Sequence, residues 1–98
     1  MTDRLELSTF EPHVGDVFKI DVAEGPSLAL TLAEANRGPW QPHEGPPTAF
    51  ELMFRGPADP VLPQATYCLT HSSLGDLDIF IVPIARSEAA TTYQAVFS

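Results

Sequence analysis

The feature that most constrains the fold is a two-residue alternation of apolar and polar side chains, which recurs in short segments along the sequence. In one segment Phe50, Leu52 and Phe54 alternate with Glu51, Met53 and Arg55. Such alternation is typical of a β-strand with one buried face. The same pattern runs through four further segments, residues 17–22, 28–35, 66–70 and 93–98.

One further segment, residues 77–84, departs from this pattern because both of its faces are apolar. One face carries Leu77, Ile79 and Ile81, and the other carries Phe80, Val82 and Ile84. In a monomeric open sheet one of these faces would form an exposed apolar patch, which soluble monomers rarely keep. We therefore expect either the N-terminal turn or another subunit to cover it. Pro83 cannot donate to a sheet ladder, which places it at an edge, a bulge or a strand end.

Six short strands separated by turn residues predict an all-β fold, a small antiparallel six-stranded barrel or sandwich. At 98 residues the protein is the size of one domain, and we assign residues 1–98 to it. Short connections favour antiparallel pairing in a meander. Ser8 and Glu11 fit a capping box, which predicts one short N-terminal helical turn. Gly15 would end that turn in a left-handed conformation.

The net charge and the absence of a signal-peptide pattern limit the expected partners and the expected cellular compartment. The formal net charge is −8, and an acidic domain repels phosphate groups, so we expect neither nucleic acid nor a membrane surface as a partner. The single cysteine, Cys68, cannot form an internal disulfide. The N-terminal residues lack the pattern of a signal peptide. We therefore expect a cytoplasmic protein, or one exported only as part of a larger particle.

No residue pattern in the sequence points to a recognisable chemistry. The three histidines, His13, His43 and His71, are not spaced as ligands of a local metal site. There is no G-x-S-x-G pattern around a nucleophile and no glycine-rich phosphate loop. We therefore predict no catalytic residue, no metal and no cofactor, and expect that the protein is not an enzyme.

Two loops carry the candidate binding residues. Arg55 and Asp59 bracket a proline-containing turn, where they could form a local ion pair, or Arg55 could bind a carboxylate on a partner. Trp40 lies in a proline- and glycine-rich loop, residues 36–47, either as a lid over one end of the barrel or as a recognition anchor. Phe80 and Val82 complete the candidate set as the apolar face of residues 77–84.

The sequence resembles an uncharacterised bacterial family of small proteins. The resemblance rests mainly on Phe-Arg-Gly-Pro-x-Asp-Pro-x-Leu-Pro-Gln-x-Thr-Tyr, residues 54–67 here, and also on His13-Val14-Gly15, Phe80-Ile81-Val82-Pro83 and Tyr93-Gln94-Ala95-Val96-Phe97. It covers nearly the whole sequence apart from residues 36–47. It implies no activity, but its members are associated with phage-tail-collar-type genes, which implies a tail-like or fibre-like assembly.

These observations favour a non-enzymatic assembly or protein-interaction module, acting on a protein partner or as a homo-oligomer. The alternative is a small-molecule-binding β-barrel with the Trp40 loop as its lid. A third hypothesis is an enzyme built on Arg55 and Asp59 with His13 or His71, which requires these side chains to meet in one cleft.

Overall fold

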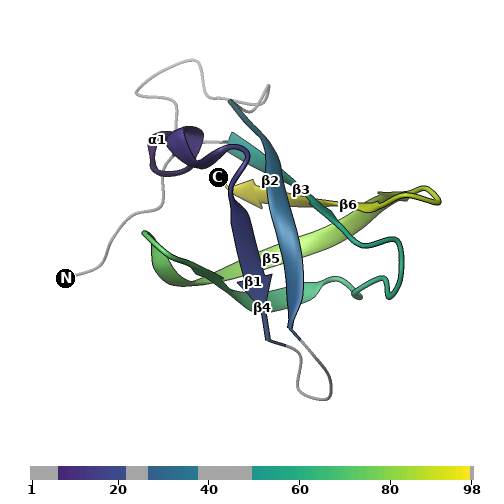
Figure 1. Ribbon diagram of the computed structural model, residues 1–98. Coiled ribbons are helices and arrows are strands. Elements are labelled where there is room, and N and C mark those ends of the chain that lie inside the picture. The colour runs from purple at the N-terminus through teal and green to yellow at the C-terminus, as the bar shows by residue number, and fades with distance from the viewer. Residues whose placement is uncertain (1–6, 22–26, 38–49, 98) are drawn as a thin grey trace.

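The computed structural model describes residues 7–21, 27–37 and 50–97 of the protein (Figure 1). The predicted single helical turn is present as α1 followed directly by the 3₁₀ turn η1. All six predicted strands are present, each within a few residues of its expected bounds. The elements are α1 (Leu7–Phe10), η1 (Glu11–His13), β1 (Val17–Ile20), β2 (Leu28–Arg37), β3 (Phe50–Gly56), β4 (Ala65–His71), β5 (Gly75–Arg86) and β6 (Thr91–Phe97).

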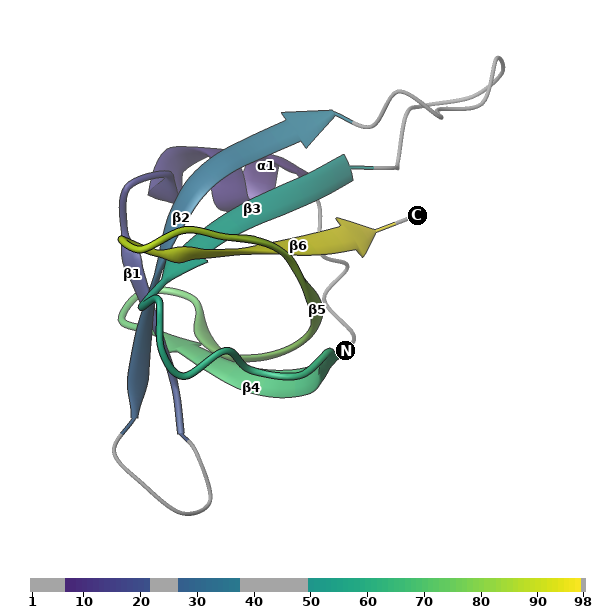
Figure 2. The same ribbon diagram turned by 90° about the vertical axis from the view of Figure 1, so that its right-hand side faces the viewer.

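The strands form a closed antiparallel barrel in the order β1-β2-β3-β6-β5-β4 (Figure 2). The antiparallel pairing agrees with the sequence prediction, and the structure decides between barrel and sandwich. The expected meander is wrong at one point, because β3 pairs with β6 along its whole length instead of with β4. The barrel closes where β1 meets β4, with Lys19 opposite Thr70 and Ile20 opposite Leu69.

The predicted inward residues form one hydrophobic core inside the barrel. The rings of Phe18 and Phe54 meet edge to face, with centroids 5.5 Å apart. Tyr93 is buried and its hydroxyl accepts a hydrogen bond from the Leu62 backbone N–H at 2.9 Å. The buried apolar residues are Phe10, Phe18, Ile20, Leu30, Leu32, Phe50, Leu52, Phe54, Leu62, Leu69, Ile79, Ile81, Tyr93 and Ala95.

The N-terminal turn packs against one end of the barrel, beside the C-terminal end of β6 (Figure 1). The Phe10 ring lies 6.0 Å from the rings of Phe50 and Phe97, measured between centroids. Gly15 has a φ of 99°, as its place at the end of the turn predicted. Val14, which follows the turn with an extended backbone, is exposed. The Ser8–Glu11 capping box is not among the hydrogen bonds of the described residues.

Closure of the barrel decides which face of β5 is buried. Ile79 and Ile81 point into the core, whereas Phe80 is half exposed on the outside. The pairing of β5 with β6 shifts register between Pro83 and Ala85, so the proline lies at a bulge, one of the predicted places. No helix in the described ranges is long and apolar enough to cross a membrane.

Candidate functional site

The candidate binding residues predicted from the sequence do not, where the structure describes them, lie together in one site. Arg55 lies near the end of β3 with its side chain exposed, and Asp59 lies in the connection that follows. The local ion pair considered for these two residues is not formed, since the ion pairs of the described residues all belong to Asp16. Phe80 and Val82 lie on the outer face of β5. Trp40 falls outside the described residues.

Three apolar side chains are exposed on the neighbouring strands β5 and β6, and together with Val82 they form the set that we call the β5–β6 outer strip. Phe80 is 50% exposed, Ile84 47% and Val96 54%, and Val82 is partly buried. In the described ranges the N-terminal turn packs elsewhere, against β3 and β6 through Phe10. Of the two covers that the sequence leaves open, the N-terminal turn and another subunit, the described part of the turn does not lie over the outer strip.

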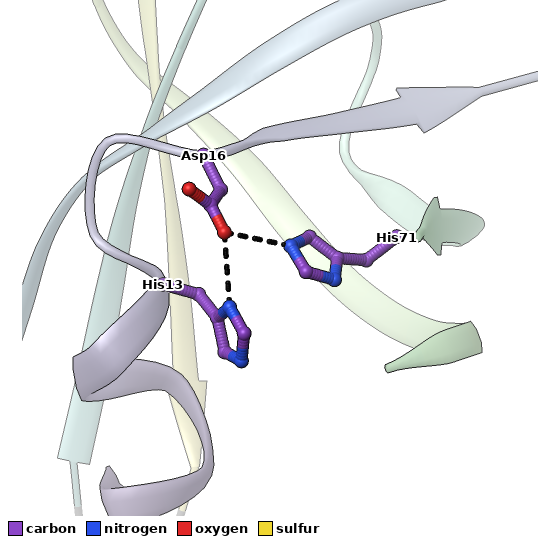
Figure 3. A group of neighbouring side chains, drawn as sticks. All are labelled: His13, Asp16 and His71. Carbon is purple, nitrogen blue, oxygen red and sulfur yellow. Dashed lines mark hydrogen bonds and ion pairs between the residues drawn. The ribbon is translucent and has the colours of Figure 1, made fainter. Parts of the chain in front are cut away.

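A second group of side chains, His13, Asp16 and His71, meets where the N-terminal turn joins the barrel (Figure 3). One carboxylate oxygen of Asp16 lies 2.9 Å from Nδ1 of His13 and 2.9 Å from Nε2 of His71. His13 is the last residue of η1 and His71 the last of β4. The two imidazole rings meet edge to face with centroids 4.5 Å apart.

The hydrogen bonds around His71 fix the position of its proton. Its Nδ1 accepts hydrogen bonds from the backbone N–H groups of Ser73 at 2.9 Å and Leu74 at 3.1 Å. Nδ1 therefore carries no proton, and Nε2 carries the one that is donated to Asp16. The buried ring thus ties the end of β4 to the turn before β5 and to the N-terminal segment at once.

Asp16 is the acceptor at the centre of this cluster and is partly exposed. Hydrogen bonds from His13 and then from His71 hold the pKa of its carboxyl group below the ordinary value of 3.8, and they outweigh the smaller opposing effect of desolvation. Its backbone also takes part, because the Asp16 carbonyl accepts from the Leu32 N–H at 3.0 Å. Asp16 is therefore held in place through both its side chain and its backbone.

The spacing of this cluster would suit a metal ion, because its ligand-type atoms lie within 4.8 Å of one another. The protonation of His71 argues against that use. A metal on Nε2 would displace the proton there, and Nδ1 could not take up that proton while two backbone N–H groups point at it. The donor set fits a hydrogen-bonded cluster better than a metal centre.

Sequence reasoning missed this cluster because its two histidines are far apart in the sequence. Asp16 and His71 are separated by 55 residues, and only barrel closure brings them together. The local part of the signal was present: His13 and Asp16 are three residues apart around Gly15, a spacing that lets their side chains meet across a turn.

Cys68 is exposed on the outer face of β4, opposite Asp78 on β5. Partial desolvation raises the pKa of its thiol, and the negative charges of Asp76 and Asp78 raise it further. The thiolate, which is the reactive form, is therefore disfavoured at neutral pH. This environment is the opposite of the one that activates a cysteine nucleophile.

Comparison with known proteins gives one family match. Residues 5–97 match the family described as Domain of unknown function (DUF6916). No curated protein and no solved structure matches the sequence. The match supports the resemblance to an uncharacterised family of small domains.

Replacing His71 tests whether its hydrogen bonds stabilise the fold. His71→Phe keeps a ring in the buried position but removes the acceptor for two backbone N–H groups and the donor to Asp16. We expect it to lower the free energy of unfolding by about 2 kcal/mol, which corresponds to a fall in Tm of roughly 8–16 °C. His13→Phe is the matched control and should cost less, because it removes one bond at a partly exposed ring. Equal Tm values for the two variants would contradict this role of His71.

The lowered pKa of Asp16 gives its contribution to stability a pH dependence of known sign. A carboxyl group whose pKa is depressed by folding stabilises the protein above the unfolded-state value of 3.8, and that contribution is lost as the pH falls through the lower, folded-state value. We therefore expect the difference in Tm between the wild type and Asp16→Asn to shrink from about pH 4 downward. Thermal unfolding across that range measures it, and a difference that stays constant would refute the effect.

Proposed function

We propose that this protein, which belongs to the DUF6916 family, is a non-enzymatic protein-interaction module that binds through the β5–β6 outer strip. The observation that carries the proposal is the exposure of Phe80, Ile84 and Val96 on one wall of a closed barrel. Exposed aromatic and aliphatic side chains that lie together on a surface are typical of binding sites. The partner is a second copy of the protein or another protein.

Two features of the outer strip support this proposal. Phe80 lies where β5 pairs with β4, and Val96 lies where β6 pairs with β3, so a partner would meet backbone that is already held in the barrel. Its side chains also alternate with Ile79 and Ile81 in the core, so the backbone that presents them is held by core packing. Little ordering is required when such a surface binds, which lowers the cost of association.

The resemblance of residues 54–67 to a family associated with phage-tail-collar-type genes suggests a setting for this interaction. We propose a tail-like or fibre-like assembly, in which many small domains bind one another or a shared scaffold. In such an assembly an acidic surface would keep the free domain soluble before it is incorporated.

The alternative of a ligand-binding barrel has less support. Contacting rings fill part of the barrel interior, including the pairs Phe18–Phe54 and Phe10–Phe50. The enzyme hypothesis is also weakened. It requires Arg55 and Asp59 to meet His13 or His71 in one cleft, but the surface hollow beside Arg55 is lined by none of the other three residues. No observation on the described residues favours either of these functions over binding.

Phe80→Asp tests the proposal, because it places a charge where an apolar contact would form. We expect association to weaken at least tenfold, since burying an unpaired charge costs more than about 1.4 kcal/mol. Val17→Asp is the matched control: Val17 is 47% exposed, close to Phe80 in exposed fraction, but lies on β1. Sedimentation velocity measures self-association, and quantitative pull-down from the host measures binding to other proteins.

The two variants separate the proposal from a general effect of charge. Binding that is retained by Val17→Asp and lost by Phe80→Asp supports the outer strip as the contact surface. Equal binding by both variants, with unchanged melting curves, would show that the strip takes no part in association.

A further inference from the structure

Two arginines from distant parts of the sequence line one surface hollow, which we call the arginine hollow. Arg55 comes from β3 and Arg86 is the last residue of β5. They are brought together because β6 lies between these strands and pairs with both, so that Thr92 is opposite Arg55 on one side and Ala85 on the other. The rest of the hollow is formed by Ser87, Ala89 and Ala90 of the β5–β6 hairpin.

This concentration of positive charge is unusual for so acidic a protein. The sequence has 5 basic residues against 13 acidic ones. Lys19, Arg55 and Arg86 are the basic residues whose side chains lie within the described parts, and two of the three line the arginine hollow. Within those parts neither arginine forms an ion pair, not even with Asp59 or Glu88 nearby in sequence. The two positive charges are therefore not neutralised by the described carboxylates.

The guanidinium group of Arg86 is already held in place. Its Nε donates a hydrogen bond to the Ala58 carbonyl oxygen at 2.9 Å, and Thr91 donates to the same oxygen at 3.4 Å. The terminal nitrogens form no hydrogen bond with the described residues. An arginine fixed at Nε retains the donors that bind a carboxylate in a planar, two-point contact.

The hairpin wall of the hollow is also rigid. The Ser87 hydroxyl oxygen accepts from the backbone N–H groups of Ala89 at 3.1 Å and Ala90 at 3.2 Å. The Ser87 N–H donates in turn to the Ala90 carbonyl at 2.8 Å. A preformed wall with small side chains leaves the arginines accessible and reduces the ordering that binding would require.

We propose that the arginine hollow binds a carboxylate group of the partner protein, from an acidic side chain or from the partner's C-terminus. This inference rests on the proposed function, and it adds the chemistry of the partner. The hollow adjoins the outer strip, because Ala85 in its wall follows Ile84 directly. The partner would therefore present an acidic group next to an apolar one. Carboxylate is favoured over the phosphates of a nucleic acid because the net charge of −8 repels a polyanion.

Short peptides test the hollow without the partner. The probe is acetyl-Ala-Glu-Ala-amide, with acetyl-Ala-Gln-Ala-amide as the uncharged control, and binding is followed by NMR on the arginine Nε–H signals. We expect the Glu peptide to shift the signals of Arg55 and Arg86 in a saturable way and the Gln peptide to leave them unchanged. Acetyl-Ala-Ala-Ala with a free C-terminus distinguishes a terminal carboxylate from a side chain.

Arg55→Gln should weaken binding of the Glu peptide about tenfold, because it removes a charge-assisted contact. This variant should fold, since Arg55 is exposed and its side chain makes no hydrogen bond in the described structure. Lys19→Gln is the matched control: it removes the same charge from an exposed position on β1 and should change the affinity less than about twofold.

Three results would overturn the carboxylate assignment. They are the absence of signal shifts with both carboxylate peptides, equal weakening by Arg55→Gln and Lys19→Gln, and tighter binding of inorganic phosphate than of the Glu peptide. None of these results bears on the Phe80→Asp comparison, so the proposed function would stand or fall separately.

Discussion

The pairing of β1 with β4 is the contact on which the rest of the structure depends. Within the described residues two pairs form this seam, Lys19 with Thr70 and Ile20 with Leu69. The cluster at Asp16 continues it, because the Asp16 carboxylate accepts a hydrogen bond from His71 at the end of β4. A closed barrel has no free strand edges, which removes the exposed backbone groups through which open sheets aggregate. The polar cluster therefore extends a short seam whose inward pair, Ile20 and Leu69, is buried in the core.

Closure of the barrel also determines which side chains lie on its outer surface. A strand with two apolar faces, β5, can bury only the face of Ile79 and Ile81, so Phe80 is turned outward. The same arrangement places β6 between β3 and β5, which brings Arg55 and Arg86 into one hollow. The apolar outer strip and the arginine hollow are thus both consequences of strand order. Together they would suit the partner that we propose, one with an apolar group beside a carboxylate.

The sequence was sufficient to predict the six strands, their inward residues and the irregular position of Pro83, because alternation and proline report local backbone geometry. It could not predict the β3–β6 pairing or the approach of His13 to His71. Alternation shows which face of a strand is buried but not which strand lies beside it. Arg55 was singled out as a possible carboxylate receptor, but Arg86 was not, because the two become neighbours only through β6.

Amide hydrogen exchange on β1 and β4 tests barrel closure most directly. In an antiparallel sheet the backbone N–H groups of a strand point alternately to its two neighbours, so an edge strand leaves every second one unpaired. If the barrel is closed, the amides of Lys19, Ile20, Leu69 and Thr70 are all protected, like those of β2 and β3. Fast exchange of the amides among these four residues that point across the seam would show an open edge. That result would contradict the account of the outer strip, in which closure decides the buried face of β5.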